Sequence, residues 1–394
     1  MDLIPKIELP NDHDTIQALY EIQEKDPKKK IIRSKDFILD DKTIWRSWTI
    51  REHIYKKKNN GLSTQARGLF TTKIGNKYTV AVRGYDKFFN VLEVEATQWP
   101  ELMSKTKGPY EVTAKENGCI IFITAKSKTK IVVTSKHSLP DPQDDPNAHG
   151  GVGYRWVIKH LNQVNMKEED LAHWIYDKKI TLVAELCDDQ FEEHILAYNE
   201  KESGLYLHGI NYNTTLLNTL PSKTVQQVAN YFGFHPIDYL ELDTMEQVRQ
   251  LSDQIEESGE FQGRPIEGVV IRCKQINQEE EKEKEFFFKI KNDHYLLFRE
   301  YREITKALLD NNKKDNSIEL KQDVKPRCGY EKSIYYVSWV KERILDHPEW
   351  FVDYKKNKGI IDVREKFEQF WETADLSQLK GDPVLNVDQS KRKK

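Results

Sequence analysis

The chain has 394 residues, of which 38% are hydrophobic and 32% are charged. These proportions are typical of a folded protein with a well-charged surface, and they exclude global disorder. The 61 basic and 64 acidic side chains give a net charge of −3. A nucleic-acid partner would therefore have to be held by a local basic surface, because the overall charge provides no attraction.

The apolar runs, such as residues 119–123, are far shorter than the ~20 residues that a membrane helix needs. The N-terminal stretch MDLIPKIELPNDHD lacks the profile of a signal peptide, so we expect no membrane segment and a location in the cytoplasm or nucleus. The cysteines lie far apart without a CxxC pair, which indicates neither a zinc site nor a disulfide framework. We expect reduced cysteines that serve in packing at Cys119, Cys187, Cys273 and Cys328.

Residues 1–60 are predicted to be an extension that packs on the domain that follows. Residues 61–291 combine short β-rich runs with a few helices, which is typical of an α+β domain. One helix follows from apolar residues at helical spacing over 225–232 and ends at Gly233, and another is predicted to begin at Asp243 with Glu246 in the capping-box position. The predicted strands are 67–73, 78–83, 119–124, 130–134, 181–187, 205–211, 267–273 and 285–290.

Two stretches read as loops or linkers, namely 138–153 and 274–285, and the second favours a solvated hairpin tip over a site. From residue 292 the strand signal gives way to apolar stripes at helical spacing. We therefore predict a separate, all-helical domain over 292–374. The polar tail 375–394 is predicted to be disordered.

Several charged side chains lie in or beside the predicted strands. Lys115 precedes an apolar run, Glu185 lies in LVAELC, and Glu267 lies in PIEGVVIR. Lys289 and Lys291 are two residues apart, so on a strand they share one face while the neighbouring apolar residues point to the other. Each of these residues, taken singly, is explained as well by a solvated strand.

The sequence lacks the usual phosphate-binding loops. No GxxxxGK(S/T) motif occurs, and GGVG at 150–153 lacks the strand-to-helix context of a dinucleotide site. Phosphate chemistry would therefore need another kind of phosphate-binding site, and the order of the charged segments suggests which kind.

Five segments in order resemble the motifs of the covalent nucleotidyltransferase superfamily, which comprises ATP-dependent DNA and RNA ligases and capping guanylyltransferases. Upstream, ARGLF and RGYDKFFN resemble the phage-type RNA ligase branch, and KENGCIIF, SKHS and CDDQFEEHI look most like the ATP-dependent sealing domain of fungal tRNA ligase. The resemblance covers roughly residues 60–310. The five segments are KENG with Lys115, AELC with Glu185, GLYLHGIN, EGVVIR with Glu267, and FFFKIK with Lys289 and Lys291.

This resemblance implies an antiparallel-sheet nucleotidyltransferase domain, unrelated to the ATP-grasp fold, over 61–291. It also implies ATP and Mg²⁺ or Mn²⁺ as cofactors, with Lys115 as the nucleophile, Lys289, Lys291 and Glu267 as further catalytic residues, and Glu185 and Glu267 at the metal. The residues expected to bind ATP are Arg67, Lys87, Asn117, Gly118, Glu185, Tyr206, Lys289 and Lys291.

The chemistry explains these residue types. A lysine amine of pKa about 10.4 is mostly protonated at neutral pH, and only its neutral form can attack the α-phosphate of ATP. The positive charge of Lys289, Lys291 and a metal would favour that neutral amine and neutralise charge on the phosphate oxygens. Glu185 and Glu267 supply the oxygen ligands that such a metal prefers.

The implied function is RNA ligation in tRNA splicing through a lysyl-AMP intermediate and an RNA-adenylate. The substrates would be tRNA halves with a 5′-phosphate end and a 2′-phosphate, 3′-OH end; a stress-response mRNA remains open as a second substrate. The same resemblance implies that His194, Arg299 and Arg302 bind the 2′-phosphate. Arg299 and Arg302 lie with Lys306 on one helix face, where a phosphate could be held. The alternative is a solvated face on which Glu300 and Glu303 are ion-pair partners.

Three other functions remain open at this stage. Capping guanylyltransferases and DNA ligases usually append an OB-fold where this chain shows helical periods. A noncatalytic RNA-binding protein on a ligase fold would not need the full set of charged residues. The family also normally carries end-healing kinase and cyclic phosphodiesterase domains, which we expect to be absent from this chain, as in an excised fragment or one partner of a split system.

Overall fold

The computed structural model describes residues 4–25, 31–57, 59–139, 145–277, 282–309, 320 and 324–373. The chain divides into two compact units, which are treated separately below. We call the first the sheet unit; it comprises Met1–Cys187, Ser203–Leu251 and Val269–Ile290. The second, the helical unit, comprises Asp188–Glu202, Ser252–Gly268 and Lys291–Lys394.

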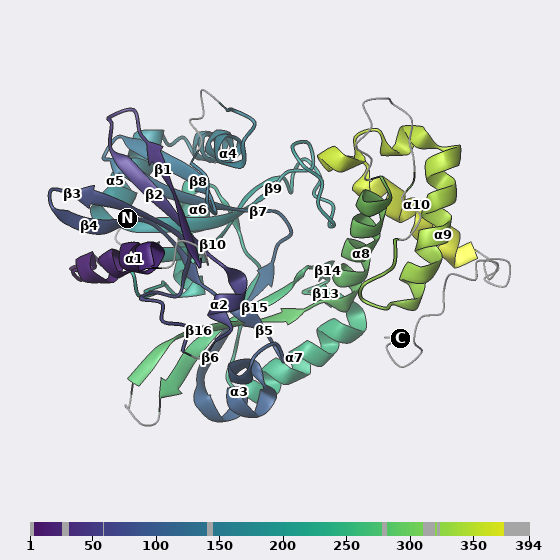
Figure 1. The fold of residues 1–394 in the computed structure, drawn as a ribbon, viewed down its shortest axis with the longest axis horizontal. Helices are drawn as coiled ribbons and strands as arrows, with labels where there is room; N and C mark the ends of the chain where they lie inside the picture. The colour runs from purple at the N-terminus through teal and green to yellow at the C-terminus, as the bar shows by residue number, and fades with distance from the viewer. Residues whose placement is uncertain are drawn as a thin grey trace. The chain divides into compact units, whose positions relative to one another are not determined.

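The first sheet of the sheet unit is an antiparallel meander covered by helix α1 (His13–Lys25) (Figure 1). Ile16 and Leu19 of α1 are fully buried against Trp48 and Leu69 of the sheet. The N-terminal segment thus packs on strands that follow it in the chain. The strands, in sheet order, are β1 (Ile32–Ile38), β2 (Ile44–Ile50), β3 (Ala66–Ile74) and β4 (Lys77–Asp86), and the short helix α2 (Glu52–Tyr55) follows β2.

A second sheet has the order β11-β10-β9-β7-β8. Helices α4 (His149–Gln163) and α5 (Glu168–Lys178) pack on β7 and β8, and α6 (Ser222–Phe232) packs on β10. Helix α6 ends at Gly233 in the left-handed conformation, as predicted. The strands are β7 (Cys119–Ser127), β8 (Lys130–Ser135), β9 (Ile180–Cys187), β10 (Gly204–Tyr212) and β11 (His235–Pro236).

A third sheet has the order β12-β6-β15-β16-β5. Its neighbouring helices in the chain are the short η1 (Glu95–Thr97), α3 (Trp99–Lys105) and α7 (Met245–Ser258). The strands are β5 (Phe89–Asn90), β6 (Thr106–Lys115), β12 (Tyr239–Leu242), β15 (Gly268–Asn277) and β16 (Lys282–Lys291).

The three sheets share a hydrophobic core. Phe70 and Val82 of the first sheet pack with Phe122 and Val183 of the second and with Phe287 of the third, and each is buried. Burial of aromatic and branched side chains of this size contributes about 1.5–3 kcal/mol each. The antiparallel sheets and the later helices confirm the predicted α+β class.

The helical unit contains three longer helices, α8 (Asp293–Leu308), α9 (Glu331–Asp346) and α10 (Ile360–Thr373), within the residues described. The ring of Tyr301 in α8 stacks on Tyr336 of α9 at 4.3 Å between centroids, and Phe367 of α10 meets both edge-on. Tyr301 and Phe367 belong to the apolar stripes that the sequence predicts for this unit. The unit also holds η2 (Pro348–Phe351), η3 (Tyr354–Lys356) and the hairpin β13 (Glu260–Phe261) and β14 (Arg264–Pro265).

Some local predictions were wrong. The stretch 138–153 is not a loop throughout, because α4 begins at His149. Its glycines are accommodated by packing, and Gly153 lies against Ile121 and Val133 of the second sheet. Similarly, α7 is capped by Thr244 with Gln247, whose side chain accepts from the backbone N–H of Thr244 at 3.1 Å, and not by Asp243 with Glu246.

Other predictions had mixed outcomes. Strand β15 continues past 274 to Asn277 and β16 begins at Lys282, so residues 274–277 and 282–285 lie in strands, and the predicted hairpin tip falls outside the described residues. None of the four cysteines, all within the described residues, forms a disulfide, but Cys328 is exposed and does not serve in packing. The tail 375–394 lies outside the described residues.

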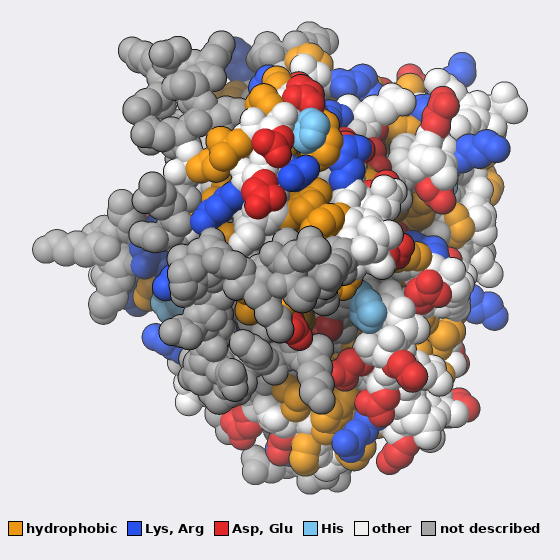
Figure 2. Space-filling view, turned by 90° about the vertical axis from the view of Figure 1, so that its right-hand side faces the viewer, with side chains coloured by type: hydrophobic (Ala, Val, Ile, Leu, Met, Phe, Trp, Pro, Cys, Tyr) orange, Lys and Arg blue, Asp and Glu red, His pale blue; other side chains and the backbone are white. Residues whose placement is uncertain are grey.

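The surface fits the small net charge. On the face drawn in Figure 2, acidic and basic side chains are interspersed. Among the described residues, no helix combines the length and the apolar character needed to cross a membrane.

Candidate active site

A cavity of about 290 Å³ lies within the sheet unit and brings together predicted residues from distant parts of the chain. Its walls include Arg67, Lys115, Gly118, Glu185 and Lys289. The remaining lining residues are Tyr85, Asp86, Phe88, Thr113, Ala114, Glu116, Ile120, Lys136, His208, Val270 and Arg272.

Lys115 lies where two sheets meet. It is the last residue of β6 in the third sheet, and Cys119 opens β7 in the second, so the KENG segment crosses from one sheet to the other. The sequence pattern missed β6 and placed Lys115 at the opening of a strand. Glu116 and Asn117 are 2% and 4% exposed, and only Glu116 of the two lines the cavity.

Gly118 is required by packing against the strand that carries Glu185. A Cβ atom at Gly118 would lie 2.0 Å from the backbone oxygen of Leu186. The backbone N–H of Gly118 donates to Glu185 Oε1 at 3.3 Å. The glycine thus lets β9 approach closely and orients the Glu185 carboxylate, which is 12% exposed.

His208 is a cavity residue that sequence reasoning did not select. Its Nε2 lies 3.7 Å from Glu185 Oε2, and its ring stacks on Tyr85 at 5.7 Å between centroids. Burial lowers the pKa of His208 below its usual value. A neutral, flat ring on the cavity wall suits contact with a nucleotide base.

Tyr85 and Arg272 hold His208 in place. The Tyr85 hydroxyl lies 3.0 Å from His208 Nδ1, and Arg272 Nη2 donates to that hydroxyl at 2.8 Å and also to the backbone oxygen of His208. Gly209 makes room, because a Cβ atom there would lie 1.9 Å from the Tyr85 hydroxyl. Sequence gave no signal for this network, which joins three strands from three sheets.

Tyr206 does not reach the cavity lining. Its ring stacks on His235 of β11 at 4.8 Å between centroids. A register shift between Leu207 and Gly209 interrupts the regular alternation of β10 around His208. The prediction that Tyr206 stacks on adenine is therefore not supported by the arrangement, and His208 is the better candidate.

Strand β16 has the predicted two faces. Phe288 and Ile290 are 0% and 4% exposed, while Lys289 points to the cavity. Lys289 Nζ lies 5.6 Å from the centroid of Phe88, within cation–π range.

Glu52 connects two of the residues predicted to bind ATP. Its carboxylate lies 2.8 Å from Arg67 Nε and 2.8 Å from Lys87 Nζ, and Lys136 Nζ lies 3.7 Å away. The two basic partners offset the effect of burial and lower the pKa of Glu52 to about 2. Lys87 belongs to this cluster but is not among the residues that line the cavity.

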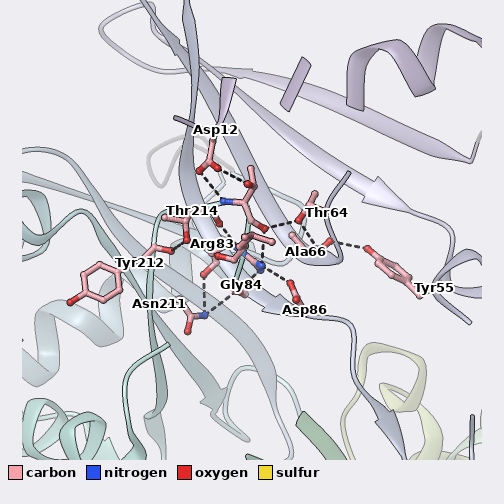
Figure 3. A network of polar contacts seen from close by, with 12 residues as sticks. Asp12, Tyr55, Thr64, Ala66, Arg83, Gly84, Asp86, Asn211, Tyr212 and Thr214 are labelled. Atoms are coloured by element: carbon pink, nitrogen blue, oxygen red, sulfur yellow. Dashed lines mark hydrogen bonds and ion pairs between the residues drawn. The ribbon is translucent and has the colours of Figure 1, made fainter. Parts of the chain in front are cut away.

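A buried arginine holds Asp86, one of the cavity residues, in a network of polar contacts (Figure 3). Arg83 is fully buried, and its guanidinium donates to Asp86 at 2.5 Å, to the Thr214 backbone oxygen at 2.8 Å and to the Gly84 backbone oxygen at 2.9 Å. Asp12 accepts from the backbone N–H of Thr215 at 2.9 Å and joins the same network. The network ties the N-terminal segment to the end of β4.

Glu267 and Lys291 belong to the helical unit. Glu267 lies near the end of its segment Ser252–Gly268, and Lys291 is the first residue of its segment Lys291–Lys394. Asn292, which follows Lys291, connects the two segments. Its backbone N–H donates to the backbone oxygen of Glu267 at 3.3 Å, and its side chain caps α8 by accepting from the backbone N–H of His294 at 3.0 Å. Its amide also donates to Gly259 and Ile266 oxygens, each at 2.7 Å. Glu267 lies one residue before β15, and Lys291 is exposed.

The three residues expected at a 2′-phosphate also lie in the helical unit. Arg302 pairs with Glu303 at 2.9 Å, as the solvated-face alternative requires, and Arg299 is exposed. Glu300 is not an ion-pair partner on that face; it is 5% exposed and accepts from the backbone N–H groups of residues 327 and 328, each at 2.6 Å.

The segment 188–202 is bound to the helical part of this unit. Glu193 accepts from the backbone N–H groups of Gly359 at 3.0 Å and Ile361 at 3.2 Å. Lys306 donates to Asn357, whose amide donates to Glu192 at 2.5 Å. His194 Nδ1 lies 3.1 Å from the Glu192 backbone oxygen, so the basic face of α8 and the His194 segment belong to one connected structure.

Comparison with known proteins supports the motif assignment. The sequence pattern of the RNA ligase family matches residues 65–297. The chain belongs to this family. It is 39% identical over 378 residues to a tRNA ligase of Candida albicans and 37% identical over 361 residues to tRNA ligase 1 of Schizosaccharomyces pombe, covering 91% and 86% of this chain. The predicted resemblance to fungal tRNA ligase is confirmed.

The chain spans 44% of the length of each of these two relatives. Among solved structures, an archaeal ATP-dependent RNA ligase is similar with a TM-score of 0.46 and 12% identity, over 92% of this chain and 82% of that one.

Proposed function

We propose that this chain is an ATP-dependent RNA ligase that forms a Lys115–AMP adduct, transfers the AMP to an RNA 5′-phosphate and joins that end to a 3′-OH. The observation that carries the proposal is the position of Lys115 in one cavity with Glu185 and Lys289. Membership of the RNA ligase family supports the reaction type.

In the first step, the neutral Lys115 amine attacks the α-phosphorus of ATP. A phosphorus–nitrogen bond forms, the bond to the bridging oxygen breaks, pyrophosphate leaves with that electron pair, and the amine loses a proton. Lys289, on the cavity wall, offsets charge on the phosphate oxygens. The RNA 5′-phosphate then takes the AMP and frees Lys115, and attack by the 3′-OH on the RNA phosphorus releases AMP.

The cavity offers carboxylates that fit a divalent cation. Asp86, Glu116 and Glu185 line it, and carboxylate oxygens are the ligands that Mg²⁺ and Mn²⁺ prefer. Glu185 is the ligand that both the sequence motif and the cavity favour, while Glu267 is proposed from its motif. A bound cation would neutralise charge on the leaving pyrophosphate.

We further propose tRNA halves with 2′-phosphate, 3′-OH ends as the RNA substrate, with His194, Arg299 and Arg302 at the 2′-phosphate. The names of the two fungal relatives, both tRNA ligases, support a tRNA substrate. Two arginines on one helix face offer the planar donors that suit a phosphate. Glu303, the ion-pair partner of Arg302, is half exposed at 52%, so solvent screens its side of the pair.

The test is incubation with α-labelled ATP or GTP and Mg²⁺, followed by a denaturing gel. We expect label from ATP and not GTP, and none in Lys115→Ala. As a matched control, Lys107→Ala changes a lysine of the same strand whose side chain is 61% exposed and paired with Glu283. Label from GTP alone would instead indicate a capping-type guanylyltransferase, and no label with either nucleotide would indicate a noncatalytic RNA-binding protein.

A further inference from the structure

Three cations from separate elements surround one carboxylate beside the cavity. Arg67 lies on β3, Lys87 directly follows β4, and Lys136 directly follows β8. They converge on Glu52, the first residue of α2. Glu52 Oε1 faces Arg67 at 2.8 Å and Lys136 at 3.7 Å, and Oε2 faces Lys87 at 2.8 Å.

We infer that Glu52 is an internal counter-ion that occupies a phosphate-binding cluster of Arg67, Lys87 and Lys136, and that a polyphosphate displaces it. The inference rests on the proposed function only in naming the polyphosphate as the β- and γ-phosphates of ATP, or pyrophosphate. Neither Glu52 nor Lys136 was selected from the sequence as a site residue.

Charge supports the displacement. Three cations and one carboxylate leave a surplus of two positive charges when Lys136 is protonated, so Glu52 does not neutralise the cluster. A phosphate group carries more oxygens and more negative charge than a carboxylate, and can contact all three cations at once. Arg67 and Lys136 also line the Lys115 cavity, which places the cluster at its wall.

Glu52 is able to leave. Its side chain is 50% exposed, and α2 is a single turn of four residues. Rotation of one side chain is therefore enough to vacate the cluster. A hollow of about 250 Å³ that Arg67 and Lys136 also line holds Glu52 together with Arg33 and Arg51, so the displaced carboxylate has two other cations within the same hollow.

The inference also bears on turnover. Pyrophosphate is the product of the first step, and a carboxylate that competes for the same cations favours its departure. Glu52 would thus weaken polyphosphate binding and speed the release of pyrophosphate.

The test is direct binding of inorganic pyrophosphate to the full chain by isothermal titration calorimetry, without nucleotide. We expect Glu52→Gln to bind about tenfold more tightly and Lys136→Ala about tenfold more weakly than wild type, since each change alters one charge at the cluster. Thermal melting checks that both variants fold.

Two matched controls distinguish an effect of the cluster itself from an effect of the protein's net charge. Asp36→Asn removes one negative charge from the Asp36–Arg46 pair of the same first sheet, and Lys130→Ala removes a lysine at the other end of β8 that pairs with Glu168. Both should bind pyrophosphate as wild type does. If Asp36→Asn bound pyrophosphate as tightly as Glu52→Gln does, the effect of Glu52 would be explained by net charge alone, and the inference would be overturned.

Unchanged or weaker binding by Glu52→Gln would also overturn it, because Glu52 would then organise the cations and not compete for them. A second experiment measures the binding of a 5′-phosphorylated RNA oligonucleotide. If Glu52→Gln bound this RNA more tightly but pyrophosphate no more tightly than wild type, the cluster would bind RNA, and the polyphosphate assignment would be refuted. Failure of the ligase proposal is distinguishable, because it shows in the Lys115 labelling assay and leaves pyrophosphate binding unaffected.

Discussion

The cavity around Lys115 and the basic face of α8 are assembled in different ways. Cavity residues come from strands β3, β4, β6, β7, β9, β10, β15 and β16, which are spread along the chain. The basic residues Arg299, Arg302 and Lys306 lie within two turns of one helix. A convergent site depends on the packing of whole sheets, whereas a helix face depends on local periodicity alone. The variants below exploit that difference.

The largest effect after loss of Lys115 is expected at the cationic strand. Lys289→Ala and Lys291→Ala should each slow adenylylation by roughly 10²-fold, the scale of a lost charge-stabilising donor, without unfolding the chain. Single-turnover labelling with ATP measures the rates. Because Lys289 lines the cavity and Lys291 is exposed in the helical unit, a wild-type rate in Lys291→Ala alone would confine the catalytic cations to the sheet unit.

On the helical unit, the double variant Arg299→Ala, Arg302→Ala should leave the Lys115–AMP adduct at wild-type levels. It should slow sealing of 2′-phosphate ends by about tenfold or more, since hydrogen bonds to charged groups contribute about 1.5–3 kcal/mol. The readout is sealing of matched RNAs with 2′-phosphate or 2′-OH ends. Arg343→Ala, on exposed pairs of α9, is the control. Equal wild-type sealing of both RNAs would refute the 2′-phosphate site.

A variant of Asn292 tests the hydrogen bonds that connect the start of α8 to Gly259 and Ile266 within the helical unit. Asn292→Ala should destabilise the protein by about 1–3 kcal/mol, because the cap of α8 and the bonds to two buried oxygens are lost together. Chemical denaturation measures the change. Asn199→Ala, on an exposed turn, should change stability little.

The smallest effect concerns pH. Burial and the charges of Arg67 and Lys87 lower the pKa of Lys136 to about 8, against the opposing effect of Glu52. Raising the pH from 7 to 9 therefore removes one positive charge from the cluster. The pKa values of Glu52, about 2, and of neighbouring His137, about 4, leave both groups unchanged over this range.

We therefore expect the ratio of pyrophosphate affinities, wild type over Lys136→Ala, to fall severalfold between pH 7 and pH 9. Comparing the two proteins cancels the titration of pyrophosphate itself. A ratio that stays constant across this range would exclude Lys136 from the cluster.

Much of the molecule was open to prediction from local pattern. Short apolar, β-rich runs marked β3, β7, β9 and β16, and helical stripes marked α8 to α10, because burial leaves its pattern in the sequence. The order of charged motifs identified Lys115, Glu185 and Lys289, since each reaction role demands a residue type. Strand β6 was missed, because Lys107, Gly108 and Pro109 at its start are residues that do not indicate a strand.

The sequence by itself determined strands such as β7, β9 and β16, the later helices, the family, and the lysine that we propose as the nucleophile with its charged neighbours. Only the tertiary structure decided that His208 and not Tyr206 faces the cavity, that Gly118 admits the backbone of Leu186, and that Lys136 and Glu52 join Arg67. These relations depend on register, on one irregularity in β10 and on the packing of separate sheets. Such contacts join residues far apart in the chain, so no local period or spacing records them.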